Sequence, residues 1–520
     1  MTKGISRRAF VKTAAVTGVA ALAGACGDDG ATSRRDTADG APDLGPDTTT
    51  ADASDTLAPD APDTTSVKDA PDVAETTTGP TPIGVFDPKT AAESLADFPF
   101  GVQAGDPDRE GAVLWTHYEG AEALDLVLFA DGAEGEPGDL YLREPATPNA
   151  AGFVHLTVSG LATDTRYRYA FLAVGAGGAL VSRSRVGRFR TAPDERRLRV
   201  VTFGGTSCVN QDYRPYRTLS RAAEADLDFF VMSGDGAYMD DAESLADYRA
   251  LWREALDTDG YRGLLGSTGI FNTWDDHEVH DNWDPEHVDP EVLGWAQTTY
   301  LDHVALRLDP SASGWKIWRR QRWGRTLELF VLDCRSERKP STRFTDDPIY
   351  ISRAQMDWLK RGLRDSPCVF KVIVNTVPIT DMPSTYPAEK DRWEGYIPQR
   401  NEILNHVLGP PGVPGTLWIS GDFHFGAIAR VDPPGGKFNS IWEVFMGQGA
   451  NMANPVWSAL GDVPAQFPFL TGTNNFVKFI CDPHADPPVI TAVFIDGDGK
   501  ELVRQELQVG ARKVDPGGLP

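Results

Sequence analysis

The chain has 520 residues and a formal net charge of −25, which limits the partners it can have. A surface this acidic repels a phosphate backbone, so nucleic acid is not expected as a partner. A small phosphorylated substrate stays possible, because a bound metal ion inverts the local field. The folded part, about 440 residues long, is too large for a single hydrophobic core and is expected to form two units.

The first 26 residues are predicted to be an export signal. They contain the twin-arginine motif "SRRAFVK" (residues 6–12), followed by an apolar run too short to span a bilayer. The run ends in "LAGAC", which resembles a lipobox with Cys26 as the lipidated residue. The alternative is an ordinary cleavage site with an incidental cysteine. We expect export by the Tat translocation machinery to the periplasm or cell surface, with the membrane touched only through an N-terminal lipid anchor.

Residues 27–82 are predicted to form a disordered acidic linker. The segment consists mainly of Asp, Thr, Ala and Pro, and residues 27–80 carry thirteen acidic and three basic side chains. Such a composition cannot bury enough apolar surface to offset the entropy of the chain. Behind a lipidated Cys26, this linker would hold the folded part away from a membrane.

Residues 83–192 are predicted to form a small all-β domain. The segments "GAVLWTHYE", "ALDLVLFAD", "AGFVHLTVSGL" and "YRYAFLAVG" are short strand patterns separated by turn signals, without helical periodicity between them. This spacing favours a β-sandwich of fibronectin or immunoglobulin type. No chemistry is visible in this part, so a packing or shielding role is expected.

Residues 195–512 are predicted to form an α/β domain, a four-layer αββα sandwich. Short apolar strands such as "LRVVTFGG", "LDFFVMSGD" and "GTLWISGDF" alternate with helical stretches such as "SRAQMDWLKRGLRD". Ligands of such sheets gather at the carboxyl ends of the strands. No disulfide is predicted for the four cysteines of this domain, because a Tat substrate folds before export.

The motif "WDDHE" (residues 274–278) places two adjacent carboxylates, an imidazole and a third carboxylate in four consecutive positions. Adjacent carboxylates raise one another's pKa unless a cation lies between them, and a bound metal ion commonly fills that role. The alternative is a capping box, with Asp275 as the N-cap and Glu278 three residues later.

Five predicted strands end in groups that suit catalysis or metal binding. A single Asp after a strand is usually a helix cap, but five such ends, two of them Gly-Asp, favour one shared site. The residues, strand by strand, are Cys208; Asp235 and Tyr238; Asp275, Asp276 and His277; Asn375; and Asp422 and His424.

The order of these motifs resembles the PhoD-like alkaline phosphatases and phosphodiesterases of the calcineurin-like metallophosphoesterase superfamily. The matching segments cover residues 98 to about 430 and include "FPFGVQAGDPDREGAVLWT", "GTSCVNQDY", "SGDGAYMDD", "WDDHEVHDNW", "LDCRSER", "VIVNTVPIT", "DRWEGYIPQR" and "SGDFHFG". The resemblance implies an enzyme that hydrolyses small phosphomono- or phosphodiesters. One departure is "SGDGAYMDD", which lacks the glutamate and the bulky residues that members often carry around the tyrosine, and this bears on substrate preference.

The resemblance also implies a centre with one ferric ion and one or two calcium ions. Cys208 and Tyr238 suit a ferric ion, and Asp235 is expected to bridge the metals. The oxygen ligands that suit calcium are Asp276, Asn375 and Asp422. His424 completes the set without assignment to either ion. The alternative reading makes Cys208 a small buried hydrophobe and Tyr238 a core aromatic.

The hypothesised mechanism is attack of a metal-bridging hydroxide on phosphorus, with Asp235 and His277 as the catalytic residues. His277 would assist the leaving group or orient the phosphate. Asp275 and Glu278 are expected to orient the ligands without binding a metal. The predicted substrate-binding residues are Arg335, Arg392 and Asn282, with Trp393 and Tyr396 beside them. Arg335 could instead pair with Asp333 or a neighbouring acid.

Two other functions stay open from the sequence. One is a phospholipase D-like diesterase, which a membrane anchor makes plausible. The other is a non-catalytic surface lipoprotein that retains the fold. Because all five strand ends keep their functional residues, the enzyme is favoured.

Overall fold

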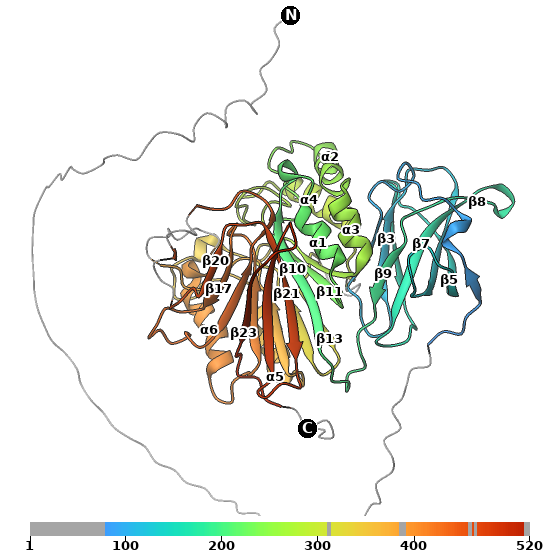
Figure 1. Ribbon diagram of the computed structural model, residues 1–520. Coiled ribbons are helices and arrows are strands. Elements are labelled where there is room, and N and C mark those ends of the chain that lie inside the picture. The colour runs from blue at the N-terminus through green and yellow to red at the C-terminus, as the bar shows by residue number, and fades with distance from the viewer. Residues whose placement is uncertain (1–78, 309–313, 384–391, 456–459, 462–464, 514–520) are drawn as a thin grey trace, which may run out of the picture. The chain divides into compact units, whose positions relative to one another are not determined.

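The computed structural model describes residues 79–308, 314–383, 392–455, 460–461 and 465–513 (Figure 1). The expected export signal, Cys26 and most of the predicted linker lie outside the described residues. Within those ranges, none of the helices has the length and apolar character needed to cross a bilayer.

The N-terminal part contains a six-stranded antiparallel sheet in the order β1-β5-β4-β7-β8, with β9 also paired to β7. Its central strands are apolar on the face that is packed, and Leu126, Leu128, Tyr169 and Phe171 are fully buried there. The strands are β1 (Gly84–Phe86), β4 (Ala123–Ala130), β5 (Gly138–Ala146), β7 (Arg166–Val174), β8 (Leu180–Arg183) and β9 (Gly187–Arg190).

The layer packed against this sheet belongs to a second, larger sheet. Strands β2 (Val102–Gly105), β3 (Ala112–His117) and β6 (Phe153–Val158) pair with one another, and β2 also pairs in parallel with β12 (Gly269–Thr273). A side chain at Gly105 would lie 1.9 Å from the carbonyl oxygen of Ala305, so this approach requires glycine. The two-layer packing expected for residues 83–192 is present, but one layer continues the sheet of the following domain. Whether the sandwich is of fibronectin or immunoglobulin type stays a prediction.

Residues 195–512 contribute to two stacked sheets, as the αββα prediction requires, and β2, β3 and β6 of the preceding part complete one of them. The ten-stranded sheet has the order β23-β22-β21-β10-β11-β12-β2-β3-β6, with β19 also paired to β10, and the seven-stranded sheet has the order β13-β14-β15-β16-β18-β17-β20. Their facing sides share one apolar core that includes Phe203, Phe229, Val331 and Val374. The first sheet adds β10 (Val201–Val209), β11 (Phe229–Ser233), β19 (Gln448–Ala450), β21 (Asn475–Asp482), β22 (Val489–Asp496) and β23 (Glu501–Leu507). The second contains β13 (Arg319–Trp323), β14 (Leu327–Val331), β15 (Phe370–Val374), β16 (Thr416–Ser420), β17 (Gly426–Arg430), β18 (Trp442–Met446) and β20 (Phe469–Thr471).

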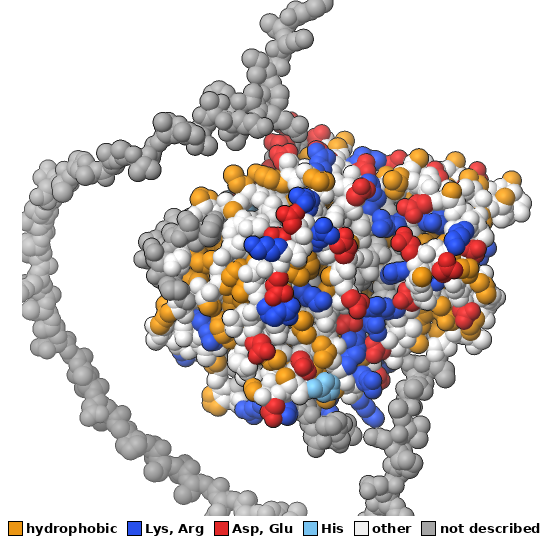
Figure 2. Space-filling view, viewed as in Figure 1, with side chains coloured by type: hydrophobic (Ala, Val, Ile, Leu, Met, Phe, Trp, Pro, Cys, Tyr) orange, Lys and Arg blue, Asp and Glu red, His pale blue; other side chains and the backbone are white. Residues whose placement is uncertain are grey.

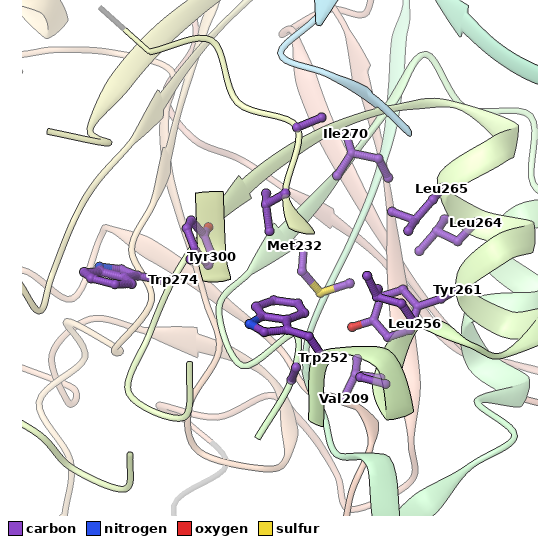
Figure 3. Packing of buried hydrophobic residues seen from close by; sticks show 14 of the residues in the cluster. Val209, Met232, Trp252, Leu256, Tyr261, Leu264, Leu265, Ile270, Trp274 and Tyr300 are labelled. Atoms are coloured by element: carbon purple, nitrogen blue, oxygen red, sulfur yellow. The ribbon is translucent and has the colours of Figure 1, made fainter. Parts of the chain in front are cut away.

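Helices cover the outer face of each sheet. Figure 3 shows part of the cluster on the outer face of the ten-stranded sheet, where Met232 and Ile270 meet Trp252 and Leu264 from helices. The helices of this layer are α1 (Arg217–Glu224), α2 (Leu245–Leu256), α3 (Asp259–Ser267) and α4 (Pro290–His303). A separate apolar cluster holds α5 (Arg353–Asp365) and α6 (Ile397–Leu408) on the seven-stranded sheet. The order of layers is therefore α, β, β, α.

A cleft between strands β7–β9 and helices α1 and α3 carries mixed charge. Figure 2 shows basic and acidic side chains side by side in this part of the surface. Six arginines and six carboxylates line the cleft, and pairs such as Arg166–Asp226 and Arg183–Glu93 neutralise one another. Its balanced charge gives the cleft no strong preference for an anion.

Candidate metal centre

The predicted functional residues stand at the carboxyl ends of parallel strands. Strands β10, β11 and β12 are parallel neighbours in one sheet, and β14, β15 and β16 are parallel neighbours in the other. Cys208 lies near the end of β10, and the other predicted residues follow β11, β12, β15 and β16. Parallel strands present their carboxyl ends at the same edge of a sheet, so these loops converge.

Backbone strain is concentrated among the predicted site residues. Nine non-glycine residues of the described ranges have positive φ, and five of these are Cys208, Asp235, Asn282, Asp422 and His424. Left-handed backbone costs roughly 1–3 kcal/mol at a non-glycine residue and persists where the surrounding structure enforces it. Its clustering here is typical of a functional site.

Cys208, Tyr238 and His424 meet around Asp235, and we call these four residues the Cys208 subsite. The Sγ of Cys208 is 3.3 Å from Oδ2 of Asp235, and the hydroxyl of Tyr238 is 3.5 Å from the same oxygen. Nε2 of His424 lies 3.1 Å from the Tyr238 hydroxyl. The subsite of His424, which the sequence left open, is therefore the one that contains Cys208.

Asp275, Asp276 and Asp422 form a second group, the Asp276 subsite, in which one oxygen of each lies within 4.8 Å of the others. Arg335 lies among them. Its Nε and Nη2 donate to Asp275 at 2.6 and 2.9 Å, and Nη2 also reaches Asp276 at 3.3 Å and Asp422 at 3.0 Å. The Arg335 side chain is 0% exposed.

The position of Arg335 differs from the expected one at the substrate entrance, because its guanidinium is enclosed by three carboxylates. The alternative considered from sequence, an ion pair with a neighbouring acid, is the arrangement observed. Asp333 instead accepts the backbone N–H of Arg335 at 3.1 Å.

Asp235 connects the two subsites. On one side, an oxygen of the Asp235 carboxylate lies within 4.8 Å of ligand atoms of Cys208 and His424. On the other side, a carboxylate oxygen of Asp235 lies within 4.8 Å of ligand atoms of Asp276 and His277. A carboxylate shared between two ligand groups is the geometry that a bridging ligand needs. The bridging role assigned from sequence is therefore compatible with the observed positions.

The electrostatics of the centre favour a bound cation. Burial, together with Asp276, raises the pKa of Asp235 well above its usual range. Burial and the neighbouring Asp235 likewise raise the pKa values of the Cys208 thiol and the Tyr238 phenol. A metal ion reverses such shifts, because it binds the deprotonated forms of these groups. A thiol, a phenol, an imidazole and several carboxylates around one point fit a metal centre.

Asp276 differs from Asp235 because positive charge lies next to it. Burial opposes its ionisation, but Arg335 and His277 outweigh burial and hold the pKa of Asp276 below its ordinary value. Its Oδ2 also accepts the backbone N–H of Asn282 at 2.7 Å. Asp276 is thus held as a carboxylate by the protein itself.

His277 lies over Tyr238, with ring centroids 4.0 Å apart and planes 26° from parallel. Its Nδ1 is 2.8 and 2.9 Å from the two oxygens of Asp240, and Asp240 in turn accepts the backbone N–H of Asp281 at 2.7 Å. Burial would lower the pKa of His277, but Asp276, Asp235 and Asp240 outweigh it and raise the pKa to about 11. Asp240 was not predicted, although an acid two residues after Tyr238 in "SGDGAYMDD" was the available signal.

Glu278 and Asp275 have the supporting contacts expected of them. Glu278 accepts the backbone N–H groups of Gly236 at 2.7 Å and Asp275 at 2.8 Å, and burial raises its pKa to about 7. The Glu278–Asp275 contact is half of the capping box considered from sequence. The other half is missing, because the Asp275 carboxylate binds Arg335 and no α-helix starts here.

The side-chain amide of Asn375 is already occupied by hydrogen bonds within the protein. Its Oδ1 accepts from Cys334 Sγ and from Nε1 of Trp393, both at 3.1 Å, and its Nδ2 donates to the carbonyl of Val377 at 2.6 Å. The two lone pairs of the oxygen are thereby engaged. This arrangement offers calcium no lone pair at Asn375, and its ligand role stays a prediction.

Of the two remaining residues predicted to bind substrate, Asn282 is exposed and Arg392 is buried. Asn282 has an exposed side chain that donates to Asp281, while its backbone N–H supports Asp276. Arg392 is only 1% exposed and pairs with Glu394 at 3.1 Å. Its neighbours Trp393 and Tyr396 are also buried. Arg392, Trp393 and Tyr396 are therefore packed inside the protein, whereas the sequence predicted that they line the substrate entrance.

Asn451 is a site residue that the sequence did not reveal. It follows β19 directly, and its Nδ2 donates to the Tyr238 hydroxyl at 2.8 Å and lies 3.3 Å from Nε2 of His424. The signal was weak, because β19 has only three residues and Asn451 carries no charge.

Comparisons with known proteins agree with this geometry. The model of the PhoD-like phosphatase family matches residues 201–450, and that of the PhoD-like phosphatase N-terminal domain matches residues 85–193, together more than half of the chain. Alkaline phosphatase D of Bacillus subtilis (strain 168) is 25% identical over 512 residues, covering 83% of this chain and 85% of that relative.

Two solved structures show the same fold. The structure of PhoD has a TM-score of 0.66 at 20% identity and covers 81% of this chain and 95% of its own. The purple acid phosphatase PPD1 from yellow lupin (Lupinus luteus) seeds has a TM-score of 0.56 at 12% identity, covering 78% and 74%. The predicted metallophosphoesterase-like fold is thereby confirmed. The chain belongs to the PhoD-like phosphatase family and is a metal-dependent hydrolase of phosphoric esters.

Proposed function

We propose that this enzyme hydrolyses small phosphomono- or phosphodiesters outside the cytoplasm while anchored to a membrane by a lipid at Cys26. The observation that carries the catalytic part is the position of Asp235, which joins two groups of buried metal ligands beside His277. The twin-arginine motif, the lipobox-like "LAGAC" and the acidic linker support the proposed location. The acidic net charge supports a small substrate rather than a nucleic acid.

We further propose a ferric ion at the Cys208 subsite and calcium at the Asp276 subsite. Thiolate and phenolate ligands from Cys208 and Tyr238 suit a ferric ion, and carboxylates suit calcium. When bound, such ions supply a nucleophilic hydroxide at neutral pH and neutralise charge that develops on the phosphate oxygens. The protein supplies the ligands, the strained loops that aim them, and the exclusion of bulk water by burial.

The residues around the centre divide the other tasks of the reaction. Asp235 holds the two subsites at a fixed separation. His277, which is 15% exposed and adjacent to Asp276, is the group placed to meet a substrate oxygen, and Asp240 holds its Nδ1. With Nδ1 engaged, only Nε2 is left to donate to a phosphate or leaving-group oxygen.

A substrate panel with metal analysis tests this proposal. Purified protein is analysed for iron and calcium and assayed with 4-nitrophenyl phosphate, bis(4-nitrophenyl) phosphate and phosphatidylcholine vesicles. We expect hydrolysis of the aryl esters, loss of activity with a chelator, and no turnover by Asp276→Ala.

The other outcomes separate the alternatives. Preferential cleavage of the vesicle lipid would identify a phospholipase D-like diesterase. Metal-loaded protein without any turnover would identify a non-catalytic lipoprotein. Near-normal hydrolysis after complete removal of calcium would contradict the calcium assignment. Fractionation of cells that produce wild type and Cys26→Ser tests the anchor, since the variant should leave the membrane fraction.

A further inference from the structure

We infer that Asn451 is a positioning residue of the Cys208 subsite, holding Tyr238 and His424 in the arrangement that binds a metal ion. The inference rests on the proposed metal centre, but it does not depend on which phosphate ester the enzyme hydrolyses. Asn451 is 8% exposed, so its amide group has to find its partners within the protein.

The pairing of two distant strands places Asn451. Strand β19 runs parallel to the end of β10, with Gln448 opposite Ser207 and Ala450 opposite Val209. The backbone N–H of Asn210 donates to the carbonyl of Ala450 at 2.9 Å, which extends this pairing past Cys208. Asn451 therefore leaves the strand beside the Cys208 ligand and on the same edge of the sheet.

The orientation of the Asn451 amide follows from its neighbour. The backbone N–H of Met452 donates to Oδ1 of Asn451 at 2.8 Å, and a backbone N–H can only donate. The amide nitrogen consequently faces the Tyr238 hydroxyl at 2.8 Å and Nε2 of His424 at 3.3 Å. The side chain thus presents donors, and no acceptor, to both ligands.

A group that only donates selects the ligand forms that a metal requires. Facing Asn451, the Tyr238 oxygen must present a lone pair, and His424 is favoured in the tautomer with a lone pair on Nε2. Metal ions bind imidazole and phenol through these lone pairs. The contact with Tyr238 can persist after metal binding, because a phenolate oxygen has more than one lone pair and its hydrogen bond is then charge-assisted. The contact with His424 is released when the metal binds, because the imidazole Nε2 has a single lone pair, which the metal then takes.

Metal retention tests the inference directly. Holoenzyme carrying Asn451→Leu, which removes the donors at similar volume, is titrated with EDTA, and bound metal is followed by elemental analysis. We expect half of the metal of the Cys208 subsite to be lost at a roughly 10- to 100-fold lower chelator concentration than in wild type. Asn451→Ser, whose side chain is too short to reach either ligand, should behave similarly and serves if the leucine variant does not fold.

Met452→Ala is the matched control. The Met452 side chain is 68% exposed, and the substitution keeps the backbone N–H that orients Asn451. Its metal retention should match wild type. In a Tyr238→Phe background, Asn451→Leu should weaken retention by a smaller factor, because one of the two ligands it positions is already absent.

The outcomes separate this inference from the proposed function. Wild-type retention in both Asn451 variants, or an equal factor with and without the Tyr238 hydroxyl, would overturn the inference even if phosphate esters are hydrolysed. A wild-type protein that holds no metal at the Cys208 subsite would overturn it as well. Weakened retention in a protein that hydrolyses no phosphate ester would support the inference and refute the proposed activity.

Discussion

The two halves of the metal centre balance charge in opposite ways. The Cys208 subsite places a thiol, a phenol and an imidazole around one carboxylate, Asp235. The Asp276 subsite places three carboxylates around a guanidinium, that of Arg335. The first half consists of groups that become anionic or expose a lone pair when a cation is bound. In the second half the protein carries its own cation, and Arg335 together with His277 holds the pKa of Asp276 below its ordinary value.

The difference indicates distinct tasks for the two halves. On the proposed assignment, Cys208 and Tyr238 would bind one metal ion, with Asn451 as a supporting donor. In the Asp276 subsite, Arg335 limits the net negative charge offered to a second ion. An arginine at that place also keeps Asp275, Asp276 and Asp422 together when no metal is bound. Each half can therefore be perturbed without the other.

The largest effect is expected at Asp235, which belongs to the Cys208 subsite and also lies beside Asp276 of the other half. Asp235→Asn keeps the shape but removes the shared negative charge, and kcat/KM for 4-nitrophenyl phosphate should fall by about 1000-fold or more, equivalent to several kcal/mol. Metal content should fall in both subsites. If only one metal were lost, Asp235 would not bridge them.

Arg335→Leu tests the Asp276 half alone. Removing one partner of a buried ion pair costs about 3–5 kcal/mol, because the remaining charges stay buried. We expect a strong drop in the thermal midpoint of the metal-free protein and a smaller drop once calcium is added, since a cation then replaces the guanidinium.

The control for Arg335 is Arg504→Leu, which breaks an exposed pair with Glu501 and should change the midpoint very little. If Arg335→Leu destabilised the metal-free and calcium-loaded forms equally, Arg335 would not be the cation that balances the charge of the Asp276 subsite.

Cys208→Ser tests the other half. Replacing a thiolate ligand by a hydroxyl should reduce metal retention at the Cys208 subsite by about 10- to 100-fold while the Asp276 subsite keeps its metal, as measured by elemental analysis. Cys481→Ala serves as the control, because Cys481 is equally buried but lies in the apolar core between the sheets. The control should lower stability and retain both metals. Loss of both metals in Cys208→Ser would mean that the halves are not independent.

The smallest effect is expected at Asp240. Its side chain contacts His277 and acts on the metal centre only through that residue. Asp240→Asn removes the charged acceptor at Nδ1 and should lower kcat by roughly tenfold, the scale of one charge-assisted hydrogen bond, with metal content unchanged. Asp241→Asn removes the neighbouring charge and should keep wild-type activity. In a His277→Gln background, Asp240→Asn should have no further effect, and a full additional loss would show that Asp240 acts elsewhere.

Much of the centre could be predicted because its residues follow local rules. An apolar run that ends in Gly-Asp or in "WDDHE" reveals both a strand and the polar group at its end, so the sequence alone locates Asp235, Asp276 and Asp422. Cys208, Tyr238 and His424 were likewise located on motif grounds. The αββα order of layers followed from the alternation of buried strands and amphipathic helices.

Other features depend on contacts between distant segments. The roles of Arg335 and Asn375 depend on which neighbours meet them, and the structure gives Arg335 three carboxylates and Asn375 the donors Cys334 and Trp393. The sequence also does not show that β2, β3 and β6 continue the sheet of β12, because the residue pattern of a strand does not identify the strand it pairs with.

The sequence by itself determined the order of elements, the family and the chemical types of the ligands, because those follow from local patterns. Only the tertiary structure decided how charge is shared in the centre. Asn451 meets Tyr238 across 213 positions of sequence, and Arg335 meets Asp275 across 60. Such encounters are set by strand pairing and sheet stacking, and no local pattern encodes them.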